Sequence, residues 1–593
     1  MPVVEKHLQK SYSHDPWFGA VLVCFTLFAW ANWGKLALPL IDIGHEVEPP
    51  ARILAGQVFY RDIESYYAPL AYYANALALL VFGQHLEVFY TVGLGLTLAA
   101  TLLFYRLAKR LMNASWSALC TVCMLVYCAI GPSIFNFIVP YSYGAVYAIV
   151  FCLLAFTFLD CYSRQDQLRW LLASAIACGF AGLAKQEYGV AMLGGVLVGI
   201  NLYSPQELKT KVWRSVLVLV IASASAFLPL ALLAQQVSWD LLQKSLLPVA
   251  KSQVLIASGM FELSLVKTFQ IWWRGFKLFF AAFPVVLGAV IAARWSAKLK
   301  WFKNFRWLQN LSELLSGVAL SIIGLAALKQ LQFFAYYSSA DFFQPLSDLS
   351  WSLPIFVGWF AFIRPRPPAY KCASLLWALL IFSLLLNARW LFYINFYGLY
   401  ATSVILLFFT LLYHLSQRMR GIMWRCLLIC LLISICIKIG ELAAYHYKVH
   451  SSYGTLYTKD IALARAFNQT IDTINASRAS SVLVLPQGTI LNFLTATHSP
   501  SRETNIIPGV LPTVGDEQNF VAHMQSKPPE LIVYVDVPFY SLKPGYQTFA
   551  EVNPLIHQWI IEKHLLIHQF PIPSQFPWNK GEIRIYSDAA SDT

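Results

Sequence analysis

Near the start of the sequence an apolar stretch is followed at once by a charged one: WFGAVLVCFTLFAWANWGKLALPLIDIGHEVEPPARILAGQVFYRDIE, residues 17–64. Residues 17–38 suffice for one membrane-spanning helix, which needs roughly 20 apolar residues. No small-residue cleavage site follows them, so we interpret them as an uncleaved first span and not as a removed signal peptide. Seven charged residues and one histidine lie between residues 40 and 64. This order predicts a membrane protein whose first loop contains charged residues that are candidates for a functional site.

The composition of the whole chain supports a membrane protein with many spans. Of 593 residues, 58% are hydrophobic and 12% charged, and the mean hydropathy is +0.57. A soluble domain has about 25% charged residues, and single cores stop growing beyond about 250–300 residues. The net charge of +13 comes from short basic runs between apolar stretches. Such runs set membrane topology, so we expect membrane lipids and no nucleic acid as partners.

Twelve further apolar stretches follow the first, which predicts thirteen spans. They are residues 86–108, 115–131, 142–161, 170–184, 186–203, 215–235, 275–293, 313–333, 351–363, 372–388, 395–414 and 425–444.

The basic residues test this count, because cytoplasmic loops carry an excess of Lys and Arg. With the N-terminus inside, thirteen spans place all six basic clusters in the cytoplasm. The clusters are Arg106/Lys109/Arg110, Arg164/Arg169, Lys209/Lys211/Arg214, Arg294/Lys298/Lys300/Lys303/Arg306, Arg364/Arg366/Lys371 and Arg418/Arg420/Arg425. The same count places residues 445–593 outside. We therefore predict a multi-pass membrane protein with a cytoplasmic N-terminus.

The composition changes near residue 445, which predicts two parts. Residues 1–444 form an all-α polytopic membrane domain with a first external loop at 39–85. Residues 445–593 form an extracytoplasmic α/β domain. Its helices are predicted at 460–477 and 559–564 from apolar spacing, and its strands at 481–485, 531–537, 566–570 and 582–586 from β-branched runs between turn residues.

The first external loop has an ordered set of motifs. An acidic residue, Asp42, precedes a short helical stretch that ends in Ala55-Gly56. Tyr60-Arg61-Asp62 follows, then Tyr67-Ala68-Pro69-Leu70 and Phe82-Gly83. This order resembles the first external loop of GT-C class membrane glycosyltransferases, in particular the bacterial protein O-mannosyltransferases and the lipid A aminoarabinose transferase. The stretches at 182–189 and 395–400 are also similar, so the resemblance covers nearly the whole chain.

The resemblance implies transfer of a sugar from a polyprenyl-phosphate donor to an acceptor on the far side of the membrane. The acceptor hydroxyl loses a proton as it attacks, and a carboxylate serves as general base. The family's leading loop acid corresponds to Asp42. Because the usual adjacent acidic pair is missing, Glu46 and Glu48 are further candidates. The sugar is open, and the acceptor is a glycan, a lipid or a protein.

Asp42 and Glu46 would share a helical face at i, i+4, so they are also candidate ligands of a divalent cation. Oxygen ligands suit Mg²⁺ or Mn²⁺. We predict no other cofactor.

The leaving group is a lipid phosphate, which requires positive charge at the outer face. Lys185, Arg274 and Arg389 lie there in the predicted topology. The alternative for the arginines is interfacial anchoring, and for Lys185 an ion pair with Glu187. The remaining residues expected to line the cavity are His45, Tyr60, Arg61, Asp62, Tyr141, Tyr143 and Glu187.

Two other classes of protein compete with the transferase. A transporter or lipid flippase would also have many spans, but such proteins often contain internal repeats, and none is visible here. A non-enzymatic envelope scaffold would leave the loop acids between Asp42 and Glu64 without a role. A lipid-linked sugar transferase is the prediction that uses all of these features.

Overall fold

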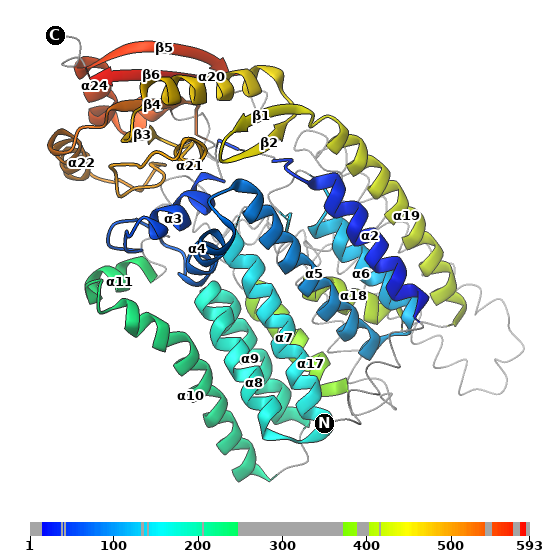
Figure 1. Cartoon of the computed structure of the whole chain (residues 1–593). Helices are drawn as coiled ribbons and strands as arrows, with labels where there is room; N and C mark the ends of the chain where they lie inside the picture. The colour runs from blue at the N-terminus through cyan, green and yellow to red at the C-terminus, as the bar shows by residue number, and fades with distance from the viewer. Residues whose placement is uncertain are drawn as a thin grey trace, which may run out of the picture.

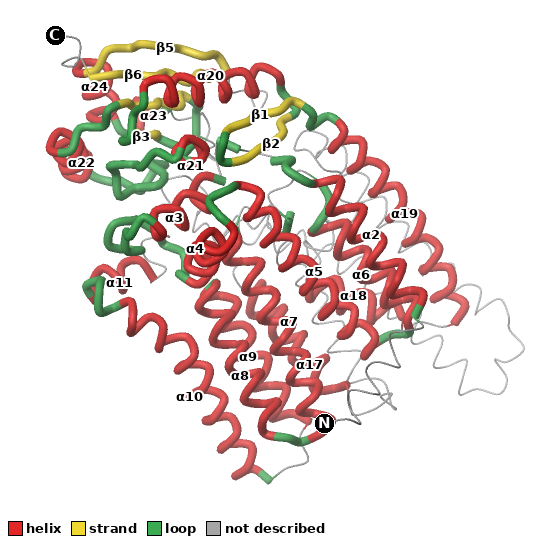
Figure 2. The backbone as a smooth tube through the Cα atoms, viewed as in Figure 1, coloured by secondary structure: helices red, strands yellow, loops and turns green. Residues whose placement is uncertain are grey.

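Long helices stand side by side and are covered at one end by short helices and β-strands (Figure 1). The computed structural model describes residues 15–36, 39–40, 43–131, 136–138, 142–203, 207–246, 372–387, 402–413, 417–539, 548–572 and 581–588. Within these ranges most residues are helical, and the strands belong to the part after residue 446 (Figure 2).

Four described helices are long and apolar enough to cross a membrane: α5 (Leu86–Leu111), α7 (Tyr143–Gln165), α10 (Leu208–Leu233) and α19 (Gln417–Ala443). Shorter apolar helices pack among them. These are α2 (Pro16–Asn32), α4 (Leu70–Phe82), α6 (Ala114–Cys128), α8 (Leu168–Ala184), α9 (Gln186–Tyr203), α17 (Ala373–Asn387) and α18 (Thr402–Tyr413). Helix α11 (Trp239–Leu246) follows α10.

Apart from α4 and α11, which correspond to no predicted span, these helices overlap the predicted spans wherever the structure describes the chain. The two neighbouring spans at 170–184 and 186–203 are separate helices, since α8 ends at Ala184 and α9 begins at Gln186. The predicted spans at 275–293, 313–333 and 351–363 lie outside the described residues, as does part of 395–414. The total of thirteen therefore stays a prediction.

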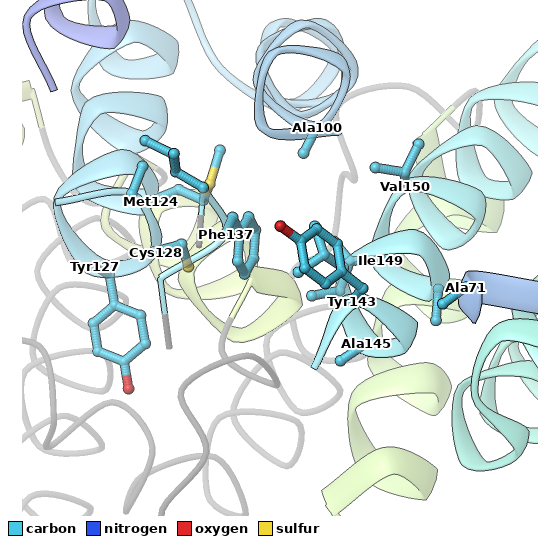
Figure 3. Close-up of a cluster of buried hydrophobic side chains, with 14 of the residues drawn as sticks. Ala71, Ala100, Met124, Tyr127, Cys128, Phe137, Tyr143, Ala145, Ile149 and Val150 are labelled. Carbon is cyan, nitrogen blue, oxygen red and sulfur yellow. The ribbon is translucent and has the colours of Figure 1, made fainter. Parts of the chain in front are cut away.

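Small residues allow the helices to pack closely. A Cβ atom at Gly93 of α5 would lie 1.9 Å from the carbonyl oxygen of Ile138, so no side chain fits there. Beside this contact Phe137 and Tyr143 pack in a buried cluster with Ala100 and Ala145 (Figure 3). Between two helices, a Cβ atom at Gly179 of α8 would lie 2.4 Å from the carbonyl oxygen of Ala222 in α10. Close approach over small residues is typical of helix packing in membranes, where apolar burial alone gives little drive for association.

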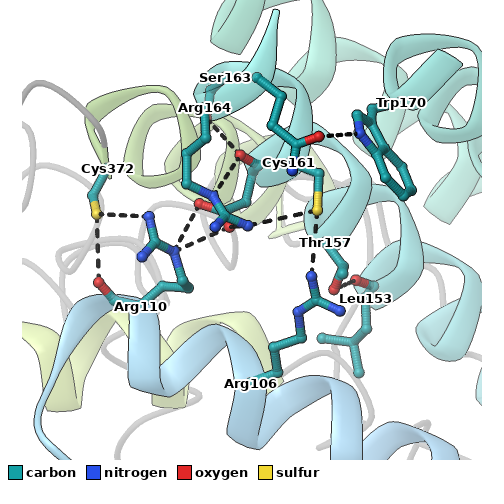
Figure 4. Close-up of polar contacts among 11 residues, drawn as sticks. Arg106, Arg110, Leu153, Thr157, Cys161, Ser163, Arg164, Trp170 and Cys372 are labelled. Carbon is teal, nitrogen blue, oxygen red and sulfur yellow. Dashed lines mark hydrogen bonds and ion pairs between the residues drawn. The ribbon is translucent and has the colours of Figure 1, made fainter. Parts of the chain in front are cut away.

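Basic side chains from α5, α7 and α10 gather at one end of the helices. The buried carboxylate of Asp160 in α7 accepts hydrogen bonds at 3.0 Å from Arg110 of α5 and pairs with Arg164 at 2.9 Å. Figure 4 shows Arg110 and Arg164 at this cluster. Arg214 of α10 pairs with Asp166, just beyond α7, at 2.6 Å. Three of the basic clusters that the sequence assigns to the cytoplasm are thus neighbours in space.

The first loop and the part of the chain after residue 445, here called the C-terminal segment, meet at the end of the helices opposite the basic side chains. The hairpin of β1 (Tyr447–Ser451) and β2 (Gly454–Thr458) follows α19 directly. Its turn accepts a hydrogen bond from the Leu86 amide at the start of α5 (Leu86 N to Tyr453 O, 2.8 Å). Strand β2 in turn donates from Tyr457 N to Gly34 O, just beyond α2, at 2.8 Å. The hairpin therefore ties the C-terminal segment to the ends of α2 and α5.

A mixed four-stranded sheet with the order β3-β4-β6-β5 forms the rest of the C-terminal segment. Strands β3 (Val482–Leu485) and β4 (Leu531–Asp536) are parallel, whereas β6 (Gly581–Asp588) is antiparallel to both β4 and β5 (His564–Ile572). The helices here are α20 (Ile461–Ser477), α21 (Ile490–Thr495), α22 (Val514–Ser526), α23 (Phe549–Val552) and α24 (Pro554–Lys563). The strands lie where the sequence predicts them, whereas the β1–β2 hairpin, α21, α22 and α23 were not predicted.

We expect the basic end to face the cytoplasm and the loop end to face outside, because positive charge is retained inside. A reporter that fluoresces only in the cytoplasm should be dark when fused after Thr593. The same reporter fused to a chain that ends at Asp166, next to the basic cluster, should be bright. Fluorescence in the Thr593 fusion would contradict this topology.

Candidate active site

Helix α3 (Gly44–Leu54) carries the charged side chains of the first loop into the interior. Glu46, Glu48 and Arg52 are all buried, and buried charges need partners. The helix begins against the start of α21, where a Cβ atom at Gly44 would lie 2.5 Å from Thr489 Oγ1. The approach is so close that only glycine fits at this position. Helix α3 is therefore enclosed by the C-terminal segment as well as by the spanning helices.

The carboxylate of Glu46 lies at the N-terminal end of α7. Its Oε2 accepts a hydrogen bond from the Tyr143 amide at 3.0 Å, and its Oε1 lies 3.6 Å from His45 Nε2. The Tyr143 hydroxyl donates to the carbonyl oxygen of Phe89 in α5 at 2.7 Å. The unpaired amides and the dipole of a helix N-terminus stabilise a carboxylate. Glu46 is thus held at the meeting point of α3, α5 and α7.

Lys185 lies close to the same helix end, in the break between α8 and α9. It is 8% exposed, and its Nζ is 4.0 Å from Glu187 Oε1. A Cβ atom at Gly144, the second residue of α7, would lie 2.8 Å from the carbonyl oxygen of Ala184. The start of α7 is therefore in contact with the turn that carries the lysine. Glu46, Tyr143 and Lys185 gather around one helix terminus.

Glu48 lies on the opposite side of α3 from Glu46, because residues two apart on a helix point in different directions. Its Oε1 is 3.5 Å from Arg52 Nη1, whereas its buried Oε2 has no hydrogen-bond partner among the described residues. Burial raises the pKa of Glu48 to about 7, although the neighbouring Arg52 charge lowers it. The two candidate acids Glu46 and Glu48 thus lie in different environments.

Tyr60, Arg61 and Asp62 form a turn below α3. Tyr60 has a φ of +71°, is fully buried and donates from its hydroxyl to Tyr67 O at 2.6 Å. Asp62 accepts from the Val58 amide at 2.8 Å and pairs with Arg61 at 2.8 Å. Tyr60 is enclosed in protein, so it shapes the turn, whereas the side chains of Arg61 and Asp62 are partly exposed.

Arg61 and Asp62 line a cavity of about 510 Å³ between the first loop and the C-terminal segment. The neighbouring Glu64 donates from its amide to Arg502 O at 2.8 Å. Burial, reinforced by the charge of Glu503, raises the pKa of Glu64 to about 7 against the opposing effect of Arg502. The loop and the C-terminal segment therefore form a continuous, partly desolvated seam.

The structure brings together some predicted site residues and separates others. His45, Glu46, Tyr143, Lys185 and Glu187 lie around the start of α7. Glu48, Tyr60, Arg61 and Asp62 lie on the side of the loop that faces the C-terminal segment. Asp42, Tyr141, Arg274 and Arg389 lie outside the described residues.

Metal binding by Asp42 and Glu46 stays a prediction. Across the described ranges, no group of three or more His, Cys, Asp and Glu side chains is placed to hold a metal ion. The prediction assumed that Asp42 and Glu46 lie on one helix. Helix α3 begins at Gly44, so it contains Glu46 but not Asp42. Glu46 has hydrogen-bond donors around one oxygen already.

Arg52 and Arg502 are important here and were not singled out from the sequence. Arg52 donates to the carbonyl oxygens of Asp62 at 2.8 Å and Ser501 at 2.9 Å, and Arg502 donates to Tyr60 O at 2.8 Å. The acceptors are backbone atoms, which no sequence motif marks. The only signal was an arginine four residues after Glu48 on a predicted helix.

Comparisons with known proteins return solved structures alone. No family model matches the chain, and no curated protein does. The chain is similar to ArnT from Cupriavidus metallidurans bound to undecaprenyl phosphate, with 12% identity, a TM-score of 0.46, and coverage of 98% of this chain and 99% of the other. The apo state of the same protein gives 12% identity, a TM-score of 0.44, and coverage of 97% and 98%.

The chain is also similar to the Archaeoglobus fulgidus oligosaccharyltransferase in complex with Zn and sulfate. Identity is 10% and the TM-score 0.47, over 93% of this chain and 79% of the other. Both proteins are GT-C glycosyltransferases, the class that the first loop resembles. At these TM-scores no residue of this chain takes a role from either protein.

The close contact between α7 and Ala184 gives a stability prediction. Gly144→Ala should force the two apart and lower stability by about 1–3 kcal/mol, as overpacking does. Gly95→Ala in α5 is the control, because nothing lies within 4 Å of its added methyl and alanine favours helix. The midpoint temperature of thermal unfolding in detergent should therefore fall for Gly144→Ala only. Equal midpoints for both variants would contradict the contact.

The raised pKa of Glu48 gives a pH prediction. The folded pKa of about 7 lies above the ordinary 4.5, so the folded protein keeps a proton that the unfolded chain releases. The contribution of Glu48 to stability is thus greatest at low pH and falls as pH rises from about 4.5 to 7. Glu48→Gln removes this titration.

Thermal midpoints are measured at pH 5, 6, 7 and 8. The midpoint of Glu48→Gln relative to that of the wild type should rise up to about pH 7, and the difference should then stay constant. Glu562→Gln on exposed α24 controls for loss of an acid elsewhere. A constant offset between wild type and Glu48→Gln would show that Glu48 does not titrate in this window.

Proposed function

We propose that the chain is a glycosyltransferase of the bacterial cytoplasmic membrane. It moves a sugar from a polyprenyl-phosphate donor to an envelope acceptor on the extracytoplasmic side. The observation that carries the proposal is that a buried first-loop carboxylate, Glu46, and the turn that carries a nearly buried lysine, Lys185, both contact the start of α7. Transfer from a lipid phosphate needs a carboxylate for the acceptor and a cation for the leaving group.

The acceptor hydroxyl attacks the anomeric carbon, and the bond from that carbon to the phosphate oxygen breaks. The hydroxyl proton passes to a carboxylate, and the electron pair of the broken bond stays on the polyprenyl phosphate. We assign the base role to Asp42, which precedes α3 by two residues. Glu46 is the second candidate, and its hydrogen bond to Tyr143 N fixes one carboxylate oxygen.

Lys185 is the candidate for holding the donor phosphate. A free helix N-terminus could also bind that phosphate, but Glu46 already accepts the first amide of α7. A second anion beside this carboxylate is favoured only where a cation balances it. Lys185 supplies that charge from the turn against Gly144. Arg389 and Arg274 are proposed helpers.

A transporter or lipid flippase is the alternative, and the reaction products separate the two. A transferase releases polyprenyl phosphate as the sugar leaves it, whereas a flippase moves the intact donor. Purified protein in vesicles with a labelled polyprenyl-phosphate sugar and envelope extract as the acceptor source should therefore release free polyprenyl phosphate. Translocation without release would overturn the proposal.

The roles of Asp42 and Lys185 predict opposite patterns in the same assay. Asp42→Asn should lower turnover by about 10²-fold or more and leave donor binding nearly unchanged. Lys185→Ala should weaken donor binding by about tenfold or more, as loss of a charged hydrogen bond does. Lys209→Ala, an exposed lysine at the opposite end of the helices, is the control.

Glu46→Gln can still accept from Tyr143 N, so it tests basicity without removing the contact. A dead Glu46→Gln beside an active Asp42→Asn would move the base role to Glu46. Activity in all three acid variants, Glu48→Gln included, would remove the first loop from the chemistry.

A further inference from the structure

The cavity between the first loop and the C-terminal segment has no role in the chemistry above. Its volume of about 510 Å³ falls within the range of about 300–1,000 Å³ typical of small-molecule sites. Its walls come from the 52–62 part of the loop, from residues 499–503 and 511, and from α22. No described residue of a membrane-spanning helix lines it. A ligand here would project from the membrane surface.

Each acidic side chain that lines this cavity already accepts at least one hydrogen bond. Asp62 accepts from the Val58 amide and pairs with Arg61. Glu503 accepts from the Ser501 hydroxyl at 2.6 Å. Asp516 accepts from the amide and hydroxyl of Thr513, at 3.0 and 2.6 Å, as the capping box of α22.

Several basic and amide groups of the cavity are not occupied. Arg502 donates through Nη2 to Tyr60 O, which fixes its guanidinium, but its buried Nε has no partner among the described residues. No side-chain hydrogen bond or ion pair joins Asn519, His523 or Lys527 to any described residue, although all three line the cavity from α22 and its end. The surplus of donors over acceptors favours an anionic ligand.

We propose that this cavity binds the acidic group of the acceptor, a sugar that bears a phosphate or a carboxylate. This inference rests on the proposed transferase function, because it names the class of acceptor. The Arg502 guanidinium and the Lys527 ammonium supply positive charge for the acidic group, and the Asn519 amide is available for sugar hydroxyls. Phe520 and Leu511 provide apolar wall. Binding is through hydrogen bonds and charge, and no bond is made or broken.

The test measures binding of small acidic sugars to the full chain in nanodiscs, without turnover. Glucose 6-phosphate and glucuronate are the charged probes, and methyl glucoside is the neutral one. We expect the charged probes to bind and the neutral probe to bind much more weakly. The stronger of the two charged probes identifies the acidic group as phosphate or carboxylate. Equal binding of all three would overturn the proposal.

The double variant Lys527→Gln/His523→Gln should weaken binding of the charged probe by about tenfold, the loss expected for one charged hydrogen bond. Both side chains are exposed, so the fold should tolerate the change. Lys563→Gln at the end of α24, outside the cavity, is the matched control. Equal weakening by the control would show only a general charge effect and would contradict the site.

Transfer assays distinguish failure of this inference from failure of the proposed function. If transfer occurs and the double variant leaves the acceptor KM unchanged, the cavity is not the acceptor site and the transferase stands. If no transfer occurs while the charged probes bind as expected, the cavity binds an anion but the transferase, and with it the acceptor assignment, falls.

Discussion

The guanidinium of Arg52 holds the first loop and the C-terminal segment together, and the geometry at this end of the molecule depends on it. Its Nε donates to Gln57 at 2.7 Å, and its Nη2 donates to carbonyl oxygens of Asp62 and Ser501. The side chain is 6% exposed, and its bond to Ser501 is buried. A lysine could not replace it, because an ammonium group lacks the planar set of donors that reaches three directions at once.

This clamp fixes which way each loop acid faces. With Arg52 directed toward Ser501, Glu48 is held on the same side, and Glu46 is directed to the start of α7. One short helix thus presents a carboxylate to each of two regions. Glu46 faces the spanning helices at the start of α7, and Glu48 lies next to Arg52, which lines the cavity beside α22. Chemistry and recognition of a projecting ligand can be divided between them.

Hydropathy and spacing predicted the helices well, because a spanning helix must satisfy its own backbone and therefore shows as one apolar stretch. The boundary between α8 and α9 was also predicted, because Lys185 interrupts two apolar stretches. The charges of the first loop also marked it as a candidate site, since their neighbours are apolar. The partners of those charges were not predictable. Arg52 reaches Ser501 O and Arg502 reaches Tyr60 O, and a backbone carbonyl carries no mark in the sequence.

The Tyr-Arg-Asp motif illustrates the same limit. Its residue types predicted a cavity lining, and Arg61 and Asp62 do line the cavity beside the C-terminal segment. Tyr60 does not, because its positive φ and full burial make it part of a turn. The helix at 514–526 was missed because its apolar face is weak. Its capping box with Thr513 and Asp516 was the available sign.

The hydrogen bond from Arg52 to Ser501 joins residues that are 449 positions apart. A ribosome that adds about 5–20 residues per second needs roughly 20–90 s to make the chain between them. During that interval α3 has left the ribosome while its arginine lacks one of its final acceptors. The loop end of a nascent chain is therefore incomplete until the C-terminal segment has been synthesised. Completion of the polypeptide is what closes this end.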